Sequence, residues 1–434
     1  DNAAAGDLTN DDVRVDAKDL RVKVVGEGGN LGFTQLARIE YSKIGGHINT
    51  DAVDNSGGVN MSDLEVNLKI LLSSAVGRKE LTFETRNTLL TQLAGDVSEK
   101  VLSKNRVQSL VLSLGVRKSR KSLGYYRGLT LALEREGLLD RKGEFLPDED
   151  TFQRRIQLKA GLTRPELAVL MGYSKMSLFN TLIESDVLAD NFLERHLFDY
   201  FPTVLQERFP EDIRKHQLRR EIIATQVANF VVEVMGAPFV HRAAEETGVK
   251  RVNVVKCFLI ADAVVGGDKL LAALTTLDKP HTSRLYHTVL LKLSAAIDGM
   301  TRWFLEHRAE STSLTDTVQR YKGAFKLLSD ESDALASQIE KTRLRDNNRQ
   351  LIMSGMPREL AAALTATAYA TSFLDIIEIS LVLSAQGNKV ELRDVAKLYS
   401  HLAAALNLRT LLEQASEIES TDKWETAAVR ALTA

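Results

Sequence analysis

The sequence is poor in cysteine and proline, with one cysteine and seven prolines among 434 residues. A single cysteine excludes an intrachain disulfide framework and is typical of a reducing compartment. Cys257 lies in the apolar run from Val254 to Ile260, so we expect a small buried side chain there rather than a reactive thiol. Because proline breaks helices, its scarcity leaves long stretches open to continuous helix.

An excess of charge of either sign is also absent. The 56 Lys and Arg residues nearly balance the 58 Asp and Glu residues, which leaves a formal net charge of -2. Proteins that bind nucleic acid or anionic membranes in general need a cationic footprint. We therefore expect no nucleic-acid partner and no membrane surface for this chain.

Targeting and membrane signals are missing as well. Residues 1–7 have neither a positive nor an apolar region, so we expect no signal peptide. No apolar stretch runs uninterrupted for about 18 residues, which predicts that there is no membrane span. The sequence does not start with Met, and we interpret this as a sign of a piece of a longer protein.

Strand-like segments are confined to the first part of the chain. Residues 21–25 predict a strand that runs into a glycine turn, and residues 47–50 predict a second, shorter strand. Between them, Leu36, Ile39 and Ile44 share one face of a predicted helix that the Gly45-Gly46 pair ends. This pattern predicts a small α/β region.

After a second glycine turn at residues 55–58, the sequence predicts only helices. A helix from about Ser62 places four leucines on one face, Leu64, Leu68, Leu71 and Leu72. Farther on, Thr163, Pro165 and Glu166 mark a helix start with a capping box. We predict a mainly α fold, with the α/β region and its exit helix over residues 1–76. A large irregular all-helical domain of about twelve to sixteen helices follows over residues 77–434.

The first glycine run has the context of a phosphate-binding loop. Gly26, Gly28 and Gly32 follow a predicted strand and precede a predicted helix, where backbone N–H groups can hold a phosphate. Their spacing is G-x-G-x-x-x-G, one residue away from the usual dinucleotide pattern. A tight strand-to-helix turn is therefore the alternative interpretation.

Two asparagines and a serine stand at similar places in the predicted α/β region. Asn30 and Asn55 each follow a predicted strand, and Ser62 lies near the predicted start of the next helix. An asparagine side chain can hold an amide such as the nicotinamide carboxamide, and a serine at a helix start suits a carboxylate. The alternative is that the asparagines hold left-handed turns and Ser62 only caps its helix.

The same residues carry a resemblance to a known family. The stretch KVVGEGGNLGFT at residues 23–34 and the stretch NTDAVDNSGGV at residues 49–59 resemble the bacterial large NAD-dependent glutamate dehydrogenases. The stretches GLTRPELA at 161–168 and HQLRREI at 216–222 look like the C-terminal region of that family. The α/β region would then be a remnant of a Rossmann-type dinucleotide domain.

The resemblance implies roles for individual residues. The superfamily patterns E-G-A-N and N-A-G-G-V-x-x-S place Asn30 and Asn55 on cofactor-contacting asparagines, with Gly28 and Gly29 beside them. They place Ser62 on the serine that binds the substrate carboxylate and Val59 beside the substrate. This sequence differs at Gly29 and Ser56, where alanine is usual, and at Leu31-Gly32, where a turn with proline is usual.

The implied enzyme converts L-glutamate, NAD and water to 2-oxoglutarate, ammonia and NADH. Its catalytic lysines, catalytic aspartate and main phosphate loop match nothing here, so we expect no catalytic residue in this segment and no activity from it alone. The family also implies a cytoplasmic homo-oligomer, a homotetramer. Two alternatives remain, a non-catalytic helical scaffold or interaction module and a dehydrogenase for another amino acid.

Other polar clusters carry weaker signals. The basic segment from Gly115 to Arg127 is interpreted as a solvated helix start or a subunit contact. Asp375 and Glu378, in an apolar run, are predicted to form interhelical salt bridges. The histidines show no metal-ligand spacing, so we expect no metal site.

Overall fold

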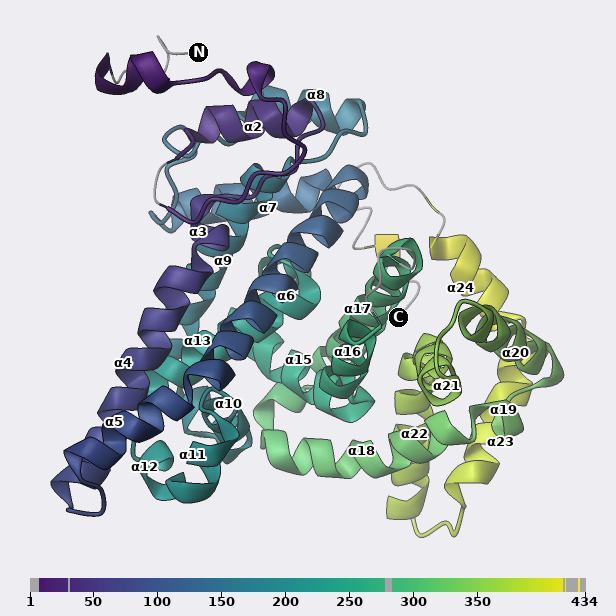
Figure 1. Cartoon of the computed structure of the whole chain (residues 1–434). Coiled ribbons are helices and arrows are strands. Elements are labelled where there is room, and N and C mark those ends of the chain that lie inside the picture. Colours follow the sequence, from purple (N-terminus) through teal and green to yellow (C-terminus); the bar gives the residue numbers. More distant parts are fainter. Residues whose placement is uncertain (1–7, 30–31, 278–282, 417, 419–427, 430–434) are drawn as a thin grey trace. The chain divides into compact units, whose positions relative to one another are not determined.

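The computed structural model describes residues 8–29, 32–277, 283–416, 418 and 428–429. The described chain is mainly helical, as predicted, and it divides into two compact units, Asp1–Arg242 and Ala243–Ala434. Figure 1 shows the elements of both units. The predicted domain boundary after residue 76 falls at the end of helix α4, inside the first unit, and stays a prediction.

Most of the first unit is helical, with short 3-10 helices at Leu8–Val13 (η1), Ala17–Asp19 (η2), Asp186–Ala189 (η3) and Asn191–Leu193 (η4). Its α-helices, in chain order, are α2 Gln35–Lys43, α3 Asp51–Asp54, α4 Ser56–Gly77, α5 Phe83–Gln92, α6 Ala94–Lys121, α7 Leu123–Arg135, α8 Glu149–Gln157, α9 Arg164–Ile183, α10 Glu194–Phe198, α11 Thr203–Arg208, α12 Pro210–Arg214 and α13 Arg219–Met235. Helix α14, Phe239–Thr247, spans the boundary between the units.

The long helices α4, α6, α9 and α13 build the core of the first unit. Helix α6 packs against both α4 and α9, and α9 packs against α13 (Figure 1). The four leucines predicted to share a face of α4 are all buried, Leu64, Leu68, Leu71 and Leu72. Burial of each leucine contributes about 1.5–3 kcal/mol, so this face fixes α4 against α6.

A polar cluster fastens the middle of α4 to the segment around α10 to α13. The buried amide of Asn67 donates to the hydroxyl of Tyr200 at 2.9 Å, and that hydroxyl donates to Asp63 at 2.8 Å. His216 Nε2 lies 3.2 Å from the carbonyl oxygen of Asn67, while His216 Nδ1 accepts from the backbone N–H of Leu218. The bond to Leu218 leaves the ring proton on Nε2, so His216 donates to Asn67.

The start of α9 is built as predicted. The side chain of Thr163 accepts from the backbone N–H of Glu166, whose carboxylate accepts from the backbone N–H of Thr163 at 2.7 Å, in a capping box. The Glu166 carboxylate also accepts two hydrogen bonds from Arg155, at 2.9 and 3.0 Å. The free backbone N–H groups of Thr163 and Glu166 and the buried Glu166 carboxylate thus all have hydrogen-bond partners.

The predicted strands form only one isolated parallel bridge, between Val24 and His47. The predicted β-strands at residues 21–25 and 47–50 are therefore wrong. The described residues contain no Rossmann-type sheet. Two short extended segments without a third strand gain little from pairing, and parallel pairing is the less stable kind. Helix α2 connects the two segments and ends before Gly45, as predicted, but of its three predicted core residues only Ile39 is buried.

The second unit packs around α15, Arg251–Val265, which α17 (Ser283–Glu306) and α18 (Leu314–Asp330) cover. Its other helices are α16 Gly267–Thr275, α19 Ser332–Leu335, α20 Gln338–Met353, α21 Arg358–Ala366, α22 Ala370–Ala385, α23 Leu392–Ala405 and α24 Leu408–Ser416, with 3-10 helices η6 Ala309–Ser311 and η7 Thr367–Tyr369. Helix α15 is apolar on nearly every side, which is typical of a fully buried helix. Cys257 is fully buried in it, as predicted, and burial raises the pKa of its thiol.

The carboxylates on α22 join helices of the second unit. Glu378 accepts from the hydroxyl of Tyr321 at 2.6 Å and lies 3.5 Å from Arg320, which confirms its predicted salt bridge. Asp375 instead accepts hydrogen bonds from Trp303 Nε1 at 2.7 Å and from the Tyr399 hydroxyl at 3.1 Å. Its predicted salt bridge is therefore wrong for the described residues, where Asp375 joins α22 to α17 and α23 through neutral partners.

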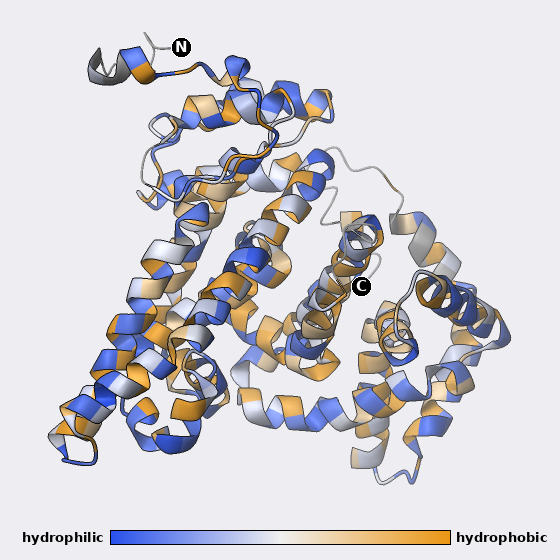
Figure 2. Cartoon of the chain, viewed as in Figure 1, coloured by the Kyte–Doolittle hydropathy of each residue, from blue (hydrophilic) through white to orange (hydrophobic). Residues whose placement is uncertain are grey.

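Most helices carry apolar residues on one side and polar residues on the other (Figure 2). Among the described residues, the segment Arg358–Ala385 is long and apolar enough to cross a membrane by length and composition alone, and the bent pair α13 and α14 passes the same test only if taken together. In Arg358–Ala385, 56% of the most apolar window is buried within the structure. A core helix meets the same criteria, so this segment is weak evidence for a membrane span.

Candidate functional site

The two motif segments of the first unit lie next to each other. The backbone N–H of Val25 donates to the carbonyl of His47 at 2.9 Å, and the N–H of His47 donates to Lys23 at 3.0 Å. The N–H of Glu27 then reaches the carboxylate of Asp54 at 3.2 Å. The first glycine motif and the residue before Asn55 are thereby in direct contact.

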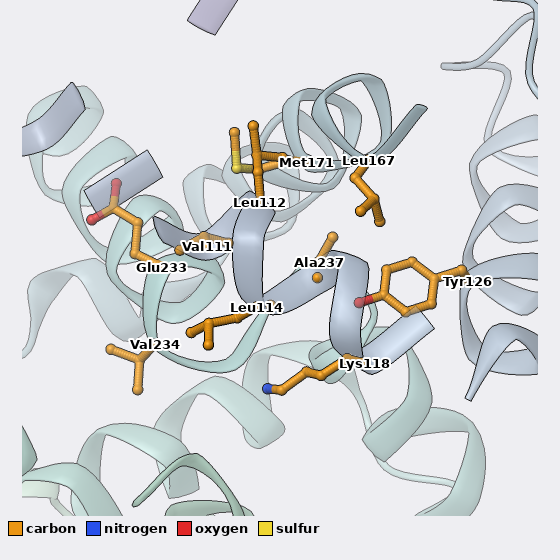
Figure 3. Close-up of a pocket in the computed structure, with 12 residues that line it drawn as sticks. Val111, Leu112, Leu114, Lys118, Tyr126, Leu167, Met171, Glu233, Val234 and Ala237 are labelled. Atoms are coloured by element: carbon orange, nitrogen blue, oxygen red, sulfur yellow. The ribbon is translucent and has the colours of Figure 1, made fainter. Parts of the chain in front are cut away.

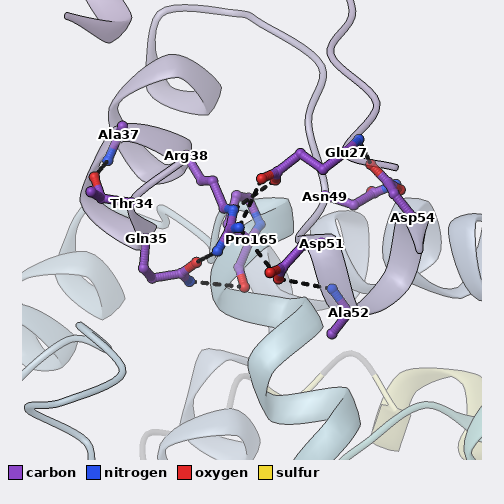
Figure 4. Close-up of polar contacts among 10 residues, drawn as sticks. All are labelled: Glu27, Thr34, Gln35, Ala37, Arg38, Asn49, Asp51, Ala52, Asp54 and Pro165. Atoms are coloured by element: carbon purple, nitrogen blue, oxygen red, sulfur yellow. Dashed lines mark hydrogen bonds and ion pairs between the residues drawn. The ribbon is translucent and has the colours of Figure 1, made fainter. Parts of the chain in front are cut away.

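A buried ion pair holds the first motif against helix α2. Arg38 donates to both carboxylate oxygens of Glu27, at 2.7 and 2.8 Å, and its guanidinium lies 3.3 Å from Asp51 (Figure 4). Burial alone would lower the pKa of Arg38, but the hydrogen bonds and charge of Glu27, with the charges of Asp51 and Asp54, raise it above its ordinary value. Arg38 is therefore a fixed cation that binds both motif segments.

Asp54 and Asn49 extend this network. One carboxylate oxygen of Asp54 accepts from Asn49 Nδ2 at 2.7 Å, and the other accepts from the backbone of Glu27 (Figure 4). Asp54 therefore bridges the two motifs immediately before Asn55. We did not single out Arg38, Asn49 or Asp54 from the sequence. The one available signal was that Asn49 and Asp54 lie within the second motif, residues 49–59.

Asn55 is half-buried at the junction of α3 and α4. Its φ of -80° excludes the left-handed turn that was the alternative interpretation. Its amide packs against Gly58, because a Cβ placed on Gly58 would lie only 2.6 Å from Asn55 Oδ1. Glycine at position 58 thus makes room for the Asn55 side chain.

Helix α4 begins at Ser56, not near Ser62, which is its seventh residue. The predicted position of Ser62 at the helix N-terminus is therefore wrong, and residues 55–58 are not a turn. Asn55 alone separates α3 from α4, and Gly57 and Gly58 lie in the first turn of α4. The Ser62 hydroxyl donates to the carbonyl of Gly58 at 3.1 Å and is exposed, as is Val59.

Gly28 and Gly29 are exposed, and a Cβ at either position would meet no atom within 4 Å. Neither residue has a positive φ. Nothing described within the chain therefore requires glycine at these two positions. Asn30, the predicted cofactor ligand that follows them, lies outside the described residues.

A separate pocket opens between α6, α9 and α13 (Figure 3). Leu112, Leu167 and Met171 contribute to its apolar wall, while Lys118 donates to the carbonyl of Met235 at 3.1 Å. The space is enough for about one water molecule. It is too small for a dinucleotide or an amino acid.

The remaining polar candidates do not form a second site. In the basic segment, Arg127 pairs with Glu149, and Arg242 lies over the ring of Tyr125. The segment covers the end of α6 and the start of α7, so the predicted helix start accounts for only its second half. Within the described ranges, no group of three His, Cys, Asp or Glu side chains is placed to hold a metal ion.

Comparison with known proteins matches both ends of the chain to related families. Residues 1–115 match the family model described as bacterial NAD-glutamate dehydrogenase, catalytic domain, and residues 159–434 match the one described as glutamate dehydrogenase, C-terminal. Proteins named NAD-specific glutamate dehydrogenase from Halomonas elongata and Pseudomonas aeruginosa are each 36% identical over 98% of this chain and 26% of the relative. The one from Mycobacterium tuberculosis is 33% identical over the same shares. The chain thus spans about a quarter of the length of these curated relatives.

Proposed function

This chain belongs to the bacterial NAD-dependent glutamate dehydrogenase family, and on that premise we propose that it acts as the C-terminal part of such an enzyme. The full-length enzyme would oxidise L-glutamate to 2-oxoglutarate and ammonia. This part would supply one wall of the cofactor and substrate cleft, a remnant of the dinucleotide domain, together with a helical region. The residues that transfer protons at the Cα of glutamate would come from elsewhere in the enzyme.

The cofactor would lie against Gly28, Gly29, Asn30 and Asn55. The observation that carries this proposal is the pair of exposed glycines, which no positive φ and no contact with the described residues explains. A ligand that approaches the backbone closely gives a reason for them. NAD, when bound, accepts the hydride from the Cα of the substrate, and the Asn55 amide is suited to bind its carboxamide.

The substrate would lie along the start of α4. Asn55, Val59 and Ser62 follow i, i+4 and i+7 spacing, so they share one face of the helix. Val59 is 64% exposed, and the Ser62 hydroxyl is exposed beside it. By turning away from the Gly58 carbonyl, Ser62 can donate to a substrate carboxylate, and Val59 can cover its aliphatic part.

Alanine substitutions at the two glycines test the cofactor site. Because a Cβ at position 28 or 29 has open space, Gly28→Ala and Gly29→Ala should leave the free energy of unfolding unchanged or raise it by about 0.5 kcal/mol. We expect the same variants in the full-length enzyme to bind NADH about tenfold more weakly, by fluorescence titration.

Gly95→Ala is the matched control, since Gly95 is also free of contacts around its Cβ but lies on α6 away from the motifs. It should leave NADH binding unchanged. NADH binding by Gly28→Ala and Gly29→Ala that equals the wild type would contradict the proposed cofactor site.

Two other functions make different predictions. A non-catalytic helical scaffold needs no NAD, so failure of the full-length protein to bind NADH would favour it. A dehydrogenase for another amino acid would bind NADH but prefer that substrate. Turnover of glutamate and leucine compared in the wild type and in Ser62→Ala separates these cases, and an unchanged KM and kcat in Ser62→Ala would contradict the substrate role of Ser62.

We also propose that the enzyme is a cytoplasmic homotetramer. This proposal rests on the family resemblance alone. Light scattering after size-exclusion chromatography of the full-length enzyme tests it, and a monomeric mass at micromolar concentration would contradict it.

A further inference from the structure

The N-terminal end of α9 reaches into the polar network of the two motifs. Arg164 is the first residue of α9, and its Nε donates to Asn49 Oδ1 at 2.9 Å. Next to it, the carbonyl of Pro165 accepts from Gln35 Nε2 at 3.3 Å (Figure 4). Both residues lie in the segment that matches the C-terminal family model, whereas Asn49 and Gln35 lie in the segment that matches the catalytic-domain model.

From Asn49 the hydrogen bonds continue to both cofactor motifs. Asn49 uses its oxygen for Arg164 and its nitrogen for Asp54, so its amide is held at both ends. Asp54 precedes Asn55 and also binds the N–H of Glu27, which precedes Gly28. Hydrogen bonds thus connect Arg164 through the side chains of Asn49 and Asp54 to the backbone of the first motif and to the residue before Asn55.

The setting of Arg164 is unusual for a residue that only stabilises the fold. Its other partners are the side-chain oxygen of Ser113 at 2.6 Å and the two oxygens of Ser109 at 3.1 Å, all on α6. No carboxylate of the described chain forms a salt bridge with it. Burial lowers the pKa of Arg164, with the charge of Asp54 acting in the opposite direction. Hydrogen bonds to neutral oxygens compensate for the burial of this cation. The planar guanidinium group also holds α6 and Asn49 in one fixed geometry.

We propose that Arg164 is a positioning residue, through which the helical C-terminal region sets the placement of the two cofactor motifs. The inference rests on the proposed function, because it assigns Arg164 to the same cleft. This role gives a reason for the arginine that directly follows the N-cap Thr163, because capping of α9 needs only Thr163 and Glu166.

Arg164→Met in the full-length enzyme tests this proposal, because methionine fills similar space without the fork. We expect a KM for NAD about tenfold higher and a kcat at saturating NAD within about threefold of the wild type, since no reacting group is lost. Arg164→Lys should give an intermediate KM, because lysine can replace one hydrogen bond but not the fork.

Arg155→Met is the matched control. Arg155 binds Glu166 at the same helix start but touches neither motif. We expect a comparable loss of thermal stability and an unchanged KM for NAD. A simple packing defect at the start of α9 would instead change both variants alike.

A double-mutant cycle with Asn49→Leu shows whether Arg164 acts through Asn49. If it does, Arg164→Met adds little to the rise in KM already caused by Asn49→Leu. Fully additive effects, or an Arg164→Met variant with the KM of Arg155→Met, would overturn this inference alone. A wild-type enzyme that neither binds NADH nor oxidises glutamate would overturn the proposed function, and this inference with it.

Discussion

Gly58 leaves the space that the side chain of Asn55 occupies. Because a Cβ at position 58 would stand 2.6 Å from Asn55 Oδ1, Gly58→Ala must push the Asn55 amide aside. Alanine also favours the helix by about 1 kcal/mol, so stability should hardly fall while the KM for NAD rises several-fold. Steady-state kinetics and thermal melts of the variant check this, and an unchanged KM would show that Asn55 does not bind the cofactor.

His196 should make stability depend on pH. It is buried beside Phe230, with ring centroids 5.7 Å apart, and burial lowers its pKa from 6.5 to about 3. The unfolded chain therefore takes up a proton below pH 6.5 that the folded chain refuses. The stability that His196 contributes is fully present above pH 6.5, and it falls by about 1.4 kcal/mol per pH unit as the pH drops toward 3.

Urea unfolding of His196→Gln at several pH values tests this expectation. The variant should be less stable than the wild type at pH 7.5, because it loses the ring packing, but its free energy of unfolding should fall less steeply between pH 6.5 and 4.5. Parallel pH profiles for the two proteins would mean that other groups control acid unfolding.

Contacts between residues close in sequence were predictable, but contacts between residues far apart in sequence were not. Thr163 and Glu166 are three residues apart, and the buried leucines of α4 follow helical spacing, so local rules identified both. Glu27 and Arg38 are 11 positions apart, and Asn49 and Arg164 are 115 positions apart. No periodicity connects such residues, so only the folded chain brings them together.

At the level of elements, helix α4 depends on the polar cluster at its middle. Tyr200→Phe removes the hydroxyl that binds both Asp63 and Asn67, which should lower the free energy of unfolding by about 1 kcal/mol. Since Asp63 follows Ser62 directly, we expect faster amide hydrogen exchange in residues 60–70. Tyr173→Phe is a suitable control, because that hydroxyl binds Glu144 instead. Equal exchange in both variants would show that the cluster does not fasten α4.

The extent of the elements also shows where sequence patterns fail. β-Branched residues and flanking glycines predicted strands at 21–25 and 47–50, but a strand needs partners that periodicity cannot provide. A single bridge remains because only two segments meet. Similarly, Gly57 and Gly58 predicted a turn, yet α4 runs through them because Asn55 continues from α3 in a near-helical conformation.

At the level of the whole molecule, each unit has its own hydrophobic core. Phe258 is fully buried on α15 in the second unit, so Phe258→Ala should cost that unit about 3–5 kcal/mol. We expect calorimetry to show two unfolding transitions, and the substitution should lower the midpoint temperature of only one of them. NADH binding should be retained at temperatures where both units are folded. A single transition that shifts as a whole would show that the two units unfold as one.

The bond between Arg164 and Asn49 has a practical consequence for building hybrid enzymes from two related parents. The two family models leave a gap between residues 115 and 159, which looks like a natural place to exchange segments. A crossover there would take Arg164 from one parent and Asn49 from the other. A crossover between α13 and α14, near the boundary of the two units, keeps the two residues from the same parent. The gap between the family models is therefore a poor guide to where this chain can be cut and rejoined.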